Sequence, residues 1–142
     1  MYKKTVRGIS LLFAILMIMS TSTFAMDTRA SSRIAASSAR VKMGIDSNLW
    51  VYFSVNAVSI MDDIGASKIT IQRYSGSRWI TESTFTPEDV PEMQTSNELW
   101  HSATIPYSPK YSGYSYRAVV AIYATDSSGT STTTVTSTSV TT

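Results

Sequence analysis

The chain has 142 residues, with 12 lysines and arginines, 10 aspartates and glutamates, one histidine and no cysteine, and its formal net charge at pH 7 is +2. The absence of cysteine excludes a disulfide-stabilised scaffold and a zinc–thiolate site. The nearly balanced charge lacks the basic surface that nucleic-acid binding requires, and the length suits a single domain.

Residues 1–25 have the three-part layout of a secretory signal peptide. Three basic side chains precede an almost wholly apolar run at residues 9–19, and Thr23 and Ala25 supply the small residues that a signal peptidase requires. The apolar run is well short of the ~20 residues that span a bilayer. We therefore expect cleavage after Ala25 and a mature protein that has no membrane segment. We expect it to be secreted or associated with the cell wall, and the lack of a Leu-Pro-x-Thr-Gly sorting motif favours release.

Small and polar side chains at residues 26–36 predict a flexible arm in front of a domain that spans residues 37–142. Residues 37–43 predict the first strand, which a turn at residues 44–48 joins to the clearest strand, at residues 49–58. One face of that strand carries Leu49, Val51, Phe53, Val55 and Ala57, and the other carries Tyr52, Ser54 and Asn56. This period of two fits a strand and would scatter the apolar side chains around a helix.

Residues 68–74 and 78–85 predict two further strands, joined by a turn at residues 75–77. A loop of that length would place Arg73 opposite Trp79, with the guanidinium against the indole.

Residues 86–97 contain two prolines and several acidic side chains, which predicts a long exposed loop, and residues 100–105 predict a short strand. Both faces of residues 114–125 are apolar, as in a central strand. The tail at residues 131–142 is nearly all Ser, Thr and Val, which is typical of a disordered or glycosylated stalk or of a final strand. Its β-branched threonines and the turn at residues 126–129 favour the strand. Strands that alternate with glycine-containing turns predict an all-β fold, a single immunoglobulin-like β-sandwich of about seven antiparallel strands.

Two stretches of the sequence are distinctive. They are residues 59–69 with Ile71, Gln72, Gly76 and Trp79 after them, and residues 116–120 with Tyr123, Ala124 and Gly129 after them. Together they resemble a family of small exported Firmicutes proteins whose domain has no assigned function, over about residues 36–140. The resemblance implies a Gram-positive source and one secreted domain, and it brings no substrate, cofactor or catalytic residue. The family's turn before the Leu49 strand is usually glycine-rich, whereas this chain has Ile, Asp, Ser and Asn at residues 45–48.

The end of the chain is similar, more remotely, to the closing hairpin of fibronectin type III and immunoglobulin domains. Tyr116 stands two residues before Ala118, the central core position, as a tyrosine-corner residue would. Plain core packing of Tyr116 is the alternative. The chain has no Cys…Trp…Cys pattern, so the similarity extends only to the sandwich architecture.

No pattern in the sequence points to catalysis. His101 is the only histidine, so a Ser-His-Asp triad would have to use it, and no Gly-x-Ser-x-Gly elbow is present. One imidazole without a thiol cannot complete a zinc shell. We therefore expect His101 to be a surface or strand-end residue, and the protein to be neither an enzyme nor dependent on a cofactor.

Asp62 and Asp63 are the most prominent acidic pair. With carboxylates from other loops nearby, they could offer oxygen ligands to calcium. However, adjacent side chains of a strand point to opposite faces, and no EF-hand spacing follows. The favoured interpretation is a turn before Gly65 in which an aspartate accepts bonds from neighbouring backbone amides.

The aromatic residues are the remaining candidates for function, because they are too many for one small core. Exposed rings outside a cell stack on sugars or anchor protein contacts. The candidate binding residues are Trp50, Tyr52, Trp79 and Trp100, of which Trp50 and Tyr52 are favoured. The alternative is that these rings only cover the rim of the sandwich.

These observations predict a secreted, non-enzymatic binding or interaction module at or near the bacterial surface. Its expected partner is a cell-wall glycan, a host glycan or a protein. One alternative is a structural subunit that assembles by edge-strand addition, through the arm at residues 26–36 or the threonine-rich tail. A small extracellular hydrolase is less favoured, since it would need an acidic pair at a defined separation.

Overall fold

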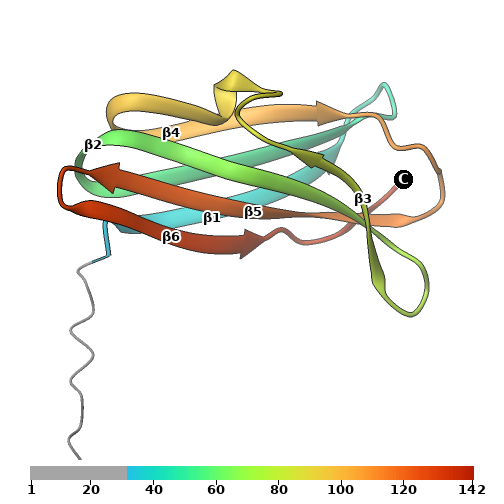
Figure 1. The fold of residues 1–142 in the computed structure, drawn as a ribbon. Coiled ribbons are helices and arrows are strands. Elements are labelled where there is room, and N and C mark those ends of the chain that lie inside the picture. Colours follow the sequence, from blue (N-terminus) through green and yellow to red (C-terminus); the bar gives the residue numbers. More distant parts are fainter. Residues whose placement is uncertain (1–31) are drawn as a thin grey trace, which may run out of the picture. The chain divides into compact units, whose positions relative to one another are not determined.

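The structure, a computed structural model, describes residues 32–142, which form seven β-strands and one short 3-10 helix, η1. In chain order the elements are β1 (Ile34–Met43), β2 (Leu49–Tyr74), β3 (Trp79–Phe85), η1 (Pro91–Met93), β4 (Gln94–Tyr107), β5 (Ser115–Asp126), β6 (Gly129–Thr136) and β7 (Val140–Thr141) (Figure 1). The predicted signal peptide and most of the predicted arm lie outside the described residues. Within the described part, no helix is long and apolar enough to cross a membrane.

All seven strands belong to one antiparallel sheet, which confirms the prediction of an all-β fold. The central strand is β2. Its first half pairs with β1 and with the C-terminal half of β4, whereas its second half pairs with β3 and β5. Both β6 and β7 pair with β5. The sheet curls, so that the part built on the start of β2 faces the part built on its end (Figure 1).

β2 is one strand of 26 residues where the sequence predicted two strands. The predicted turn at Asp62 and Asp63 is wrong, because this stretch is paired on both sides. Asp63 lies opposite Ser96 of β4 and also opposite Thr125 of β5. Backbone groups that find partners on both edges are satisfied in the extended form.

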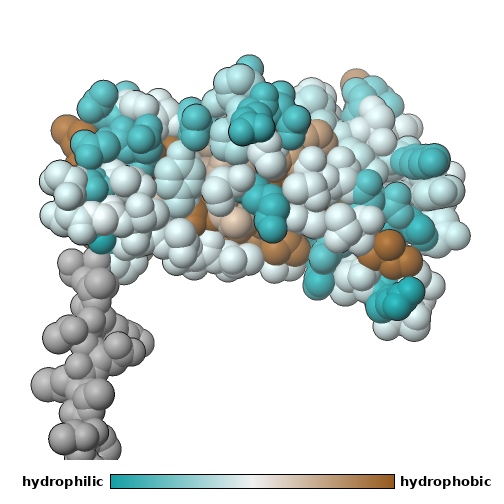
Figure 2. Space-filling model, viewed as in Figure 1, coloured by the Kyte–Doolittle hydropathy of each residue, from teal (hydrophilic) through white to brown (hydrophobic). Residues whose placement is uncertain are grey.

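Side chains from both halves of the sheet form one core. The largest fully buried side chains are Tyr116, Leu49, Met61, Ile64, Ile69, Ile71, Met93, Ile122, Val51, Val55 and Val120. Burial of each contributes about 1.5–3 kcal/mol before the loss of chain entropy is counted. On the side of the molecule seen in Figure 2, apolar residues appear only in separated patches among polar ones. Because one core cluster contains residues from both halves of the sheet, neither half buries its apolar face without the other.

The segment before β4 differs from the exposed loop predicted at residues 86–97. η1 turns the chain inward, so that Met93 is fully buried and β4 already begins at Gln94. Gln94 lies opposite Gly65 of β2. A Cβ on Gly65 would collide with the Met93 carbonyl oxygen and lie 2.7 Å from Gln94 Cα. Gly65 is thus required by the close approach of β4 and not by a turn.

The hairpin between β2 and β3 has a different register from the predicted one. Its loop closes one residue later, at Arg78, so Trp79 lies opposite Tyr74 rather than Arg73. The cation above the Trp79 ring is instead Arg117, whose guanidinium carbon is 4.2 Å from the ring centroid.

The threonine-rich tail forms strands, as its β propensity favoured. β6 pairs along β5, and Val140 of β7 lies opposite Tyr116. Tyr116 is fully buried, and its hydroxyl donates to the Tyr111 carbonyl at 2.7 Å. Tyr116 therefore packs in the core and also makes a hydroxyl bond to a backbone carbonyl five residues before it.

The end of the predicted arm belongs to the sheet, because β1 begins at Ile34. Arg33 Nε lies 2.8 Å from an Asp126 carboxylate oxygen, and the Arg33 backbone N–H donates to Ser131 Oγ at 3.0 Å. These contacts tie the start of β1 to the hairpin between β5 and β6.

Replacing Gly65 with Ala should lower the free energy of unfolding by about 3 kcal/mol or more, because β4 must move away from β2 to admit the methyl group. Gly76→Ala is the matched control. Gly76 also has a positive φ, of 94°, but a Cβ there meets nothing within 4 Å, so a loss of about 1 kcal/mol is expected. Urea unfolding measures both variants. Equal losses would contradict the role assigned to the close approach.

Tyr116→Phe should lower the free energy of unfolding by about 1–3 kcal/mol, because the ring stays buried while the Tyr111 carbonyl loses its donor. Tyr111→Phe is the control, since the bond uses the backbone of Tyr111 and not its side chain. Thermal unfolding of both variants gives the comparison. A Tyr116→Phe protein as stable as the wild type would show that Tyr116 contributes by packing alone.

Candidate functional site

Side-chain alternation on β1, β2 and β4 builds a surface on the side of the sheet that is turned away from the core. Residues directly opposite each other in an antiparallel pair lie on the same face, so the register defines rows across the three strands. The rows are Lys42, Trp50 and Pro106; Arg40, Tyr52 and Thr104; Ser38, Ser54 and Ser102; and Ala36, Asn56 and Trp100. We call these residues the outer face. The residues between them, such as Val41, Val51 and Ile105, are buried in the core.

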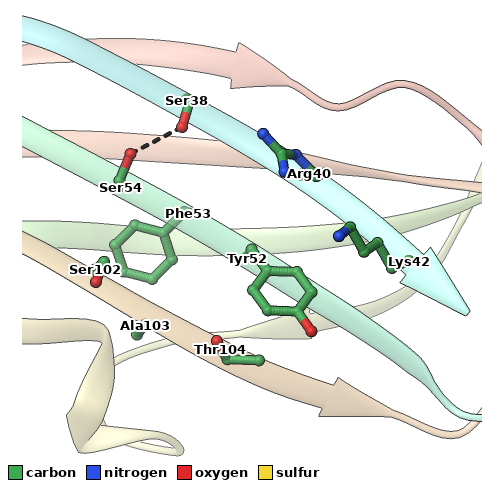
Figure 3. A pocket seen from close by; sticks show the side chains of 9 residues that line it. All are labelled: Ser38, Arg40, Lys42, Tyr52, Phe53, Ser54, Ser102, Ala103 and Thr104. Atoms are coloured by element: carbon green, nitrogen blue, oxygen red, sulfur yellow. Dashed lines mark hydrogen bonds between the residues drawn. The ribbon is translucent and has the colours of Figure 1, made fainter. Parts of the chain in front are cut away.

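The middle of the outer face is hollowed, with a volume of about 330 Å³ (Figure 3). Tyr52 projects from β2, and Arg40 and Lys42 project from β1 on the same side of the sheet. The other polar side chains that line the hollow are the hydroxyls of Ser38, Ser54, Ser102 and Thr104. The hollow thus combines one aromatic ring, two cations and several groups that both donate and accept hydrogen bonds.

Tyr52 is the aromatic residue at the centre of the hollow. Its side chain is 38% exposed, and Lys42 Nζ lies 5.9 Å from the centroid of its ring. Ser54, two residues along β2, is bonded across the strands to Ser38, with 2.8 Å between the two Oγ atoms. The Tyr52 ring therefore has cations on the side of β1, hydroxyl groups toward Ser54 and Thr104, and Trp50 in the neighbouring row.

Trp50 lies on the outer face but is also part of the turn between β1 and β2. In that turn an Asp46 oxygen accepts from Asn48 Nδ2 at 2.7 Å, and the other accepts from the Asn48 backbone N–H at 3.2 Å. The Asn48 side chain and then its backbone N–H hold the pKa of Asp46 below its usual value, and the Trp50 indole adds to this effect. Trp50 is half-buried. It therefore borders the turn as well as covering the end of the face.

The two remaining predicted tryptophans lie in different places. Trp100 is at the far end of the outer face, opposite Asn56, and is 56% exposed. Trp79 is in β3, in the other half of the sheet, where the Arg117 guanidinium covers its ring. The outer face thus brings together three of the four candidate aromatic residues and leaves Trp79 outside it.

His101 was expected at the surface or at a strand end; it lies within β4 and not at its end, and it is partly exposed. Its Nε2 is 2.8 Å from the Glu92 carbonyl oxygen. A carbonyl can only accept, so Nε2 carries the proton. The ring lies 5.8 Å from that of Phe53. Because His101 alternates with Trp100 and Ser102, it points away from the hydroxyls of the outer face.

Asp62 and Asp63 are consecutive residues of β2, so their side chains point to opposite faces. One Asp63 carboxylate oxygen accepts from Ser96 Oγ at 2.7 Å. Among residues 32–142, no three His, Cys, Asp or Glu side chains lie close enough to hold a metal ion. A calcium site at this pair would therefore depend on two carboxylates that diverge.

Arg40 and Lys42 are not among the predicted site residues, although the alternation of side chains at residues 38–42 indicates where they lie. Residues 37–43 were predicted to be a strand, in which Ser38, Arg40 and Lys42 alternate with Ala39 and Val41. That alternation already places both cations on the face opposite Val41.

No family model, no curated protein and no solved structure matches this chain. The case for a function therefore depends on the geometry and chemistry of the outer face.

Proposed function

We propose that the protein is a secreted, non-enzymatic binding module that holds a polysaccharide on the outer face of β1, β2 and β4. The observation that carries this proposal is the hollow around Tyr52, where an exposed aromatic ring shares the lining with the hydroxyls of Ser54, Ser102 and Thr104. A ring offers a flat apolar surface on which the carbon-bound hydrogens of a sugar can pack. The hydroxyls both donate and accept hydrogen bonds, which matches a polymer that is itself rich in hydroxyls.

The dimensions of the outer face favour an extended polymer over a small molecule. The path from Trp50 to Asn56 along β2 is about 20 Å, at ~3.3 Å per residue, and the three strands are about 10 Å across. The hollow occupies only the middle of this surface. Trp50 at one end and the exposed Trp100 at the other give further aromatic surface for a longer chain.

Two parts of the proposal concern the fold and the compartment. An immunoglobulin-like β-sandwich is supported by the shared core of the two sheet halves and by the Tyr116 bond to the Tyr111 carbonyl. Secretion is supported by the composition of residues 1–25 and by the resemblance to small exported Firmicutes proteins.

Assembly by edge-strand addition is less well supported than binding. Both segments that were expected to donate a strand are already paired within the sheet: the end of the arm from Ile34 onward is in β1, and the tail forms β6 and β7. Among residues 32–142 this leaves no free donor segment of the kind predicted.

Mass spectrometry of the protein recovered from the culture medium should give a chain that begins at Met26, because Thr23 and Ala25 match the cleavage rule. The full-length chain should be found only in the cell pellet. Recovery of the full-length chain from the medium would contradict cleavage.

Tyr52→Ala should weaken binding to the polysaccharide by about tenfold, which corresponds to ~1.4 kcal/mol, a typical value for a lost aromatic contact. Tyr74→Ala is the matched control: Tyr74 is on the same strand and equally exposed, at 38%, but in the other half of the sheet. Affinity electrophoresis through gels that contain cell-wall or host polysaccharides measures the binding of both variants. If the two variants lose affinity equally, or neither does, the hollow is not the binding site.

A further inference from the structure

We propose that the polysaccharide bound by the outer face is anionic, and that Arg40 and Lys42 bind its acidic groups. This inference rests on the proposed function, and it adds the chemical class of the ligand. The shared chemistry is a sugar polymer that carries carboxylate, sulfate or phosphate groups along its length.

The placement of the two cations is fixed by β1. Arg40 and Lys42 are separated by one buried residue, Val41, so both side chains leave the same face of the strand. Their Cα atoms are about 7 Å apart, at ~3.3–3.4 Å per residue. Arg40 lies in the same row as Tyr52, and Lys42 in the row beside it. A sugar ring packed on Tyr52 therefore has both cations within reach on the side of β1.

The two cations have no acidic partner within the described part of the chain, and the aromatic contact of Lys42 is with Tyr52, in the hollow itself. Arg33 is paired with Asp126 at 2.8 Å, and Arg73 is paired with Glu82 at 2.7 Å. Neither Arg40 nor Lys42 takes part in an ion pair among residues 32–142. Two like charges held side by side on a strand repel each other, so an anion bound between them would relieve the repulsion.

Arg73 and Arg117, in the other half of the sheet, are engaged in contacts within the structure. The Arg73 guanidinium also lies 4.8 Å from the Tyr111 ring centroid and 4.6 Å from that of Tyr114. Arg117 donates to Gln72 at 2.8 Å while it covers Trp79. Arg40 and Lys42, in contrast, are exposed, are in no ion pair among residues 32–142, and lie together in the lining of the hollow.

Acidic side chains are absent from the lining of the hollow. The acidic residue next along β4, Glu98, is six residues from Thr104, or about 20 Å along the strand. That distance exceeds the ~8 Å over which charge is screened at physiological salt. Asp46 lies beyond Trp50, and its carboxylate is bonded to Asn48 in the turn. The hollow is therefore a positive surface on a protein whose total charge is close to zero.

The row of Arg40, Tyr52 and Thr104 could recognise an acidic sugar in the following way. A guanidinium offers two parallel N–H donors to a carboxylate or a sulfate, whereas the Lys42 ammonium acts as a compact charge. The hydroxyl of Thr104 lies on the opposite side of Tyr52 from Arg40 and can bond a sugar hydroxyl. A neutral polymer would use the ring and the hydroxyls and leave both cations unpaired.

The contribution of charge to binding can be measured with three polymers that share one sugar backbone and differ in charge: dextran, carboxymethyl dextran and dextran sulfate. The protein should bind one or both anionic forms at least tenfold more tightly than dextran, and this preference should fall as NaCl is raised from 50 to 500 mM. Carboxymethyl dextran and dextran sulfate distinguish a carboxylate ligand from a sulfate ligand, and phosphorylated dextran, a fourth polymer with the same backbone, tests a phosphate ligand.

The variant Arg40→Gln/Lys42→Gln should lose about tenfold in affinity for the preferred anionic polymer and lose most of the salt dependence. Its control is Arg78→Gln/Lys68→Gln, which removes the same charges from two exposed residues outside the outer face. Thermal unfolding should be the same for both variants, because all four side chains are exposed.

The outcomes distinguish this inference from the function on which it rests. Equal binding of dextran and its anionic forms, with loss in Tyr52→Ala but not in Arg40→Gln/Lys42→Gln, would overturn the anionic ligand and leave the polysaccharide site standing. Equal loss in the two charge variants would show non-specific attraction and would also overturn it. No binding of any of these polymers, charged or neutral, would overturn both proposals.

Discussion

The alternation of side chains along β2 is the constraint on which the rest of the structure depends. This strand contributes buried residues to both halves of the sheet, from Leu49 near its start to Ile71 near its end. A slip of one residue in its pairing would turn those side chains to solvent. At about 1.5–3 kcal/mol for each large apolar side chain, burial outweighs the exposed ion pairs, which contribute about 0–1 kcal/mol each. Apolar burial therefore sets the register of the strands, and the register determines where the charged side chains lie.

The same alternation builds the candidate site as a by-product of the core. Tyr52 is exposed because Val51 and Phe53 are buried, and Arg40 is exposed because Val41 is buried. The outer face thus needs no loop to hold it in place. Its side chains stand on three hydrogen-bonded strands, a rigid base that keeps an aromatic ring and two cations at fixed spacing.

Local pattern was enough to predict most strands and their faces, but not the features that depend on distant partners. The two predicted strands at residues 49–58 and 68–74 are one strand, because β4 and β5 pair with the stretch between them. The sequence of residues 59–67 has no periodicity from which pairing with β4 and β5 could be predicted. The burial of Met93 likewise depends on the approach of β4 to Gly65, which only the folded chain reveals. In contrast, Arg40 and Lys42 were predictable, since their alternation with Val41 is local.

A strand common to both halves of the sheet makes the molecule a single cooperative unit. Neither half can open while the other stays closed, because each would lose the same backbone and the same core. A polymer bound only to the outer face would therefore also make the opening of β5 and β6 less frequent, because binding stabilises the folded state of the whole domain by mass action. Proteases cleave segments that open transiently, so occupancy of this one surface would protect the whole folded domain from cleavage.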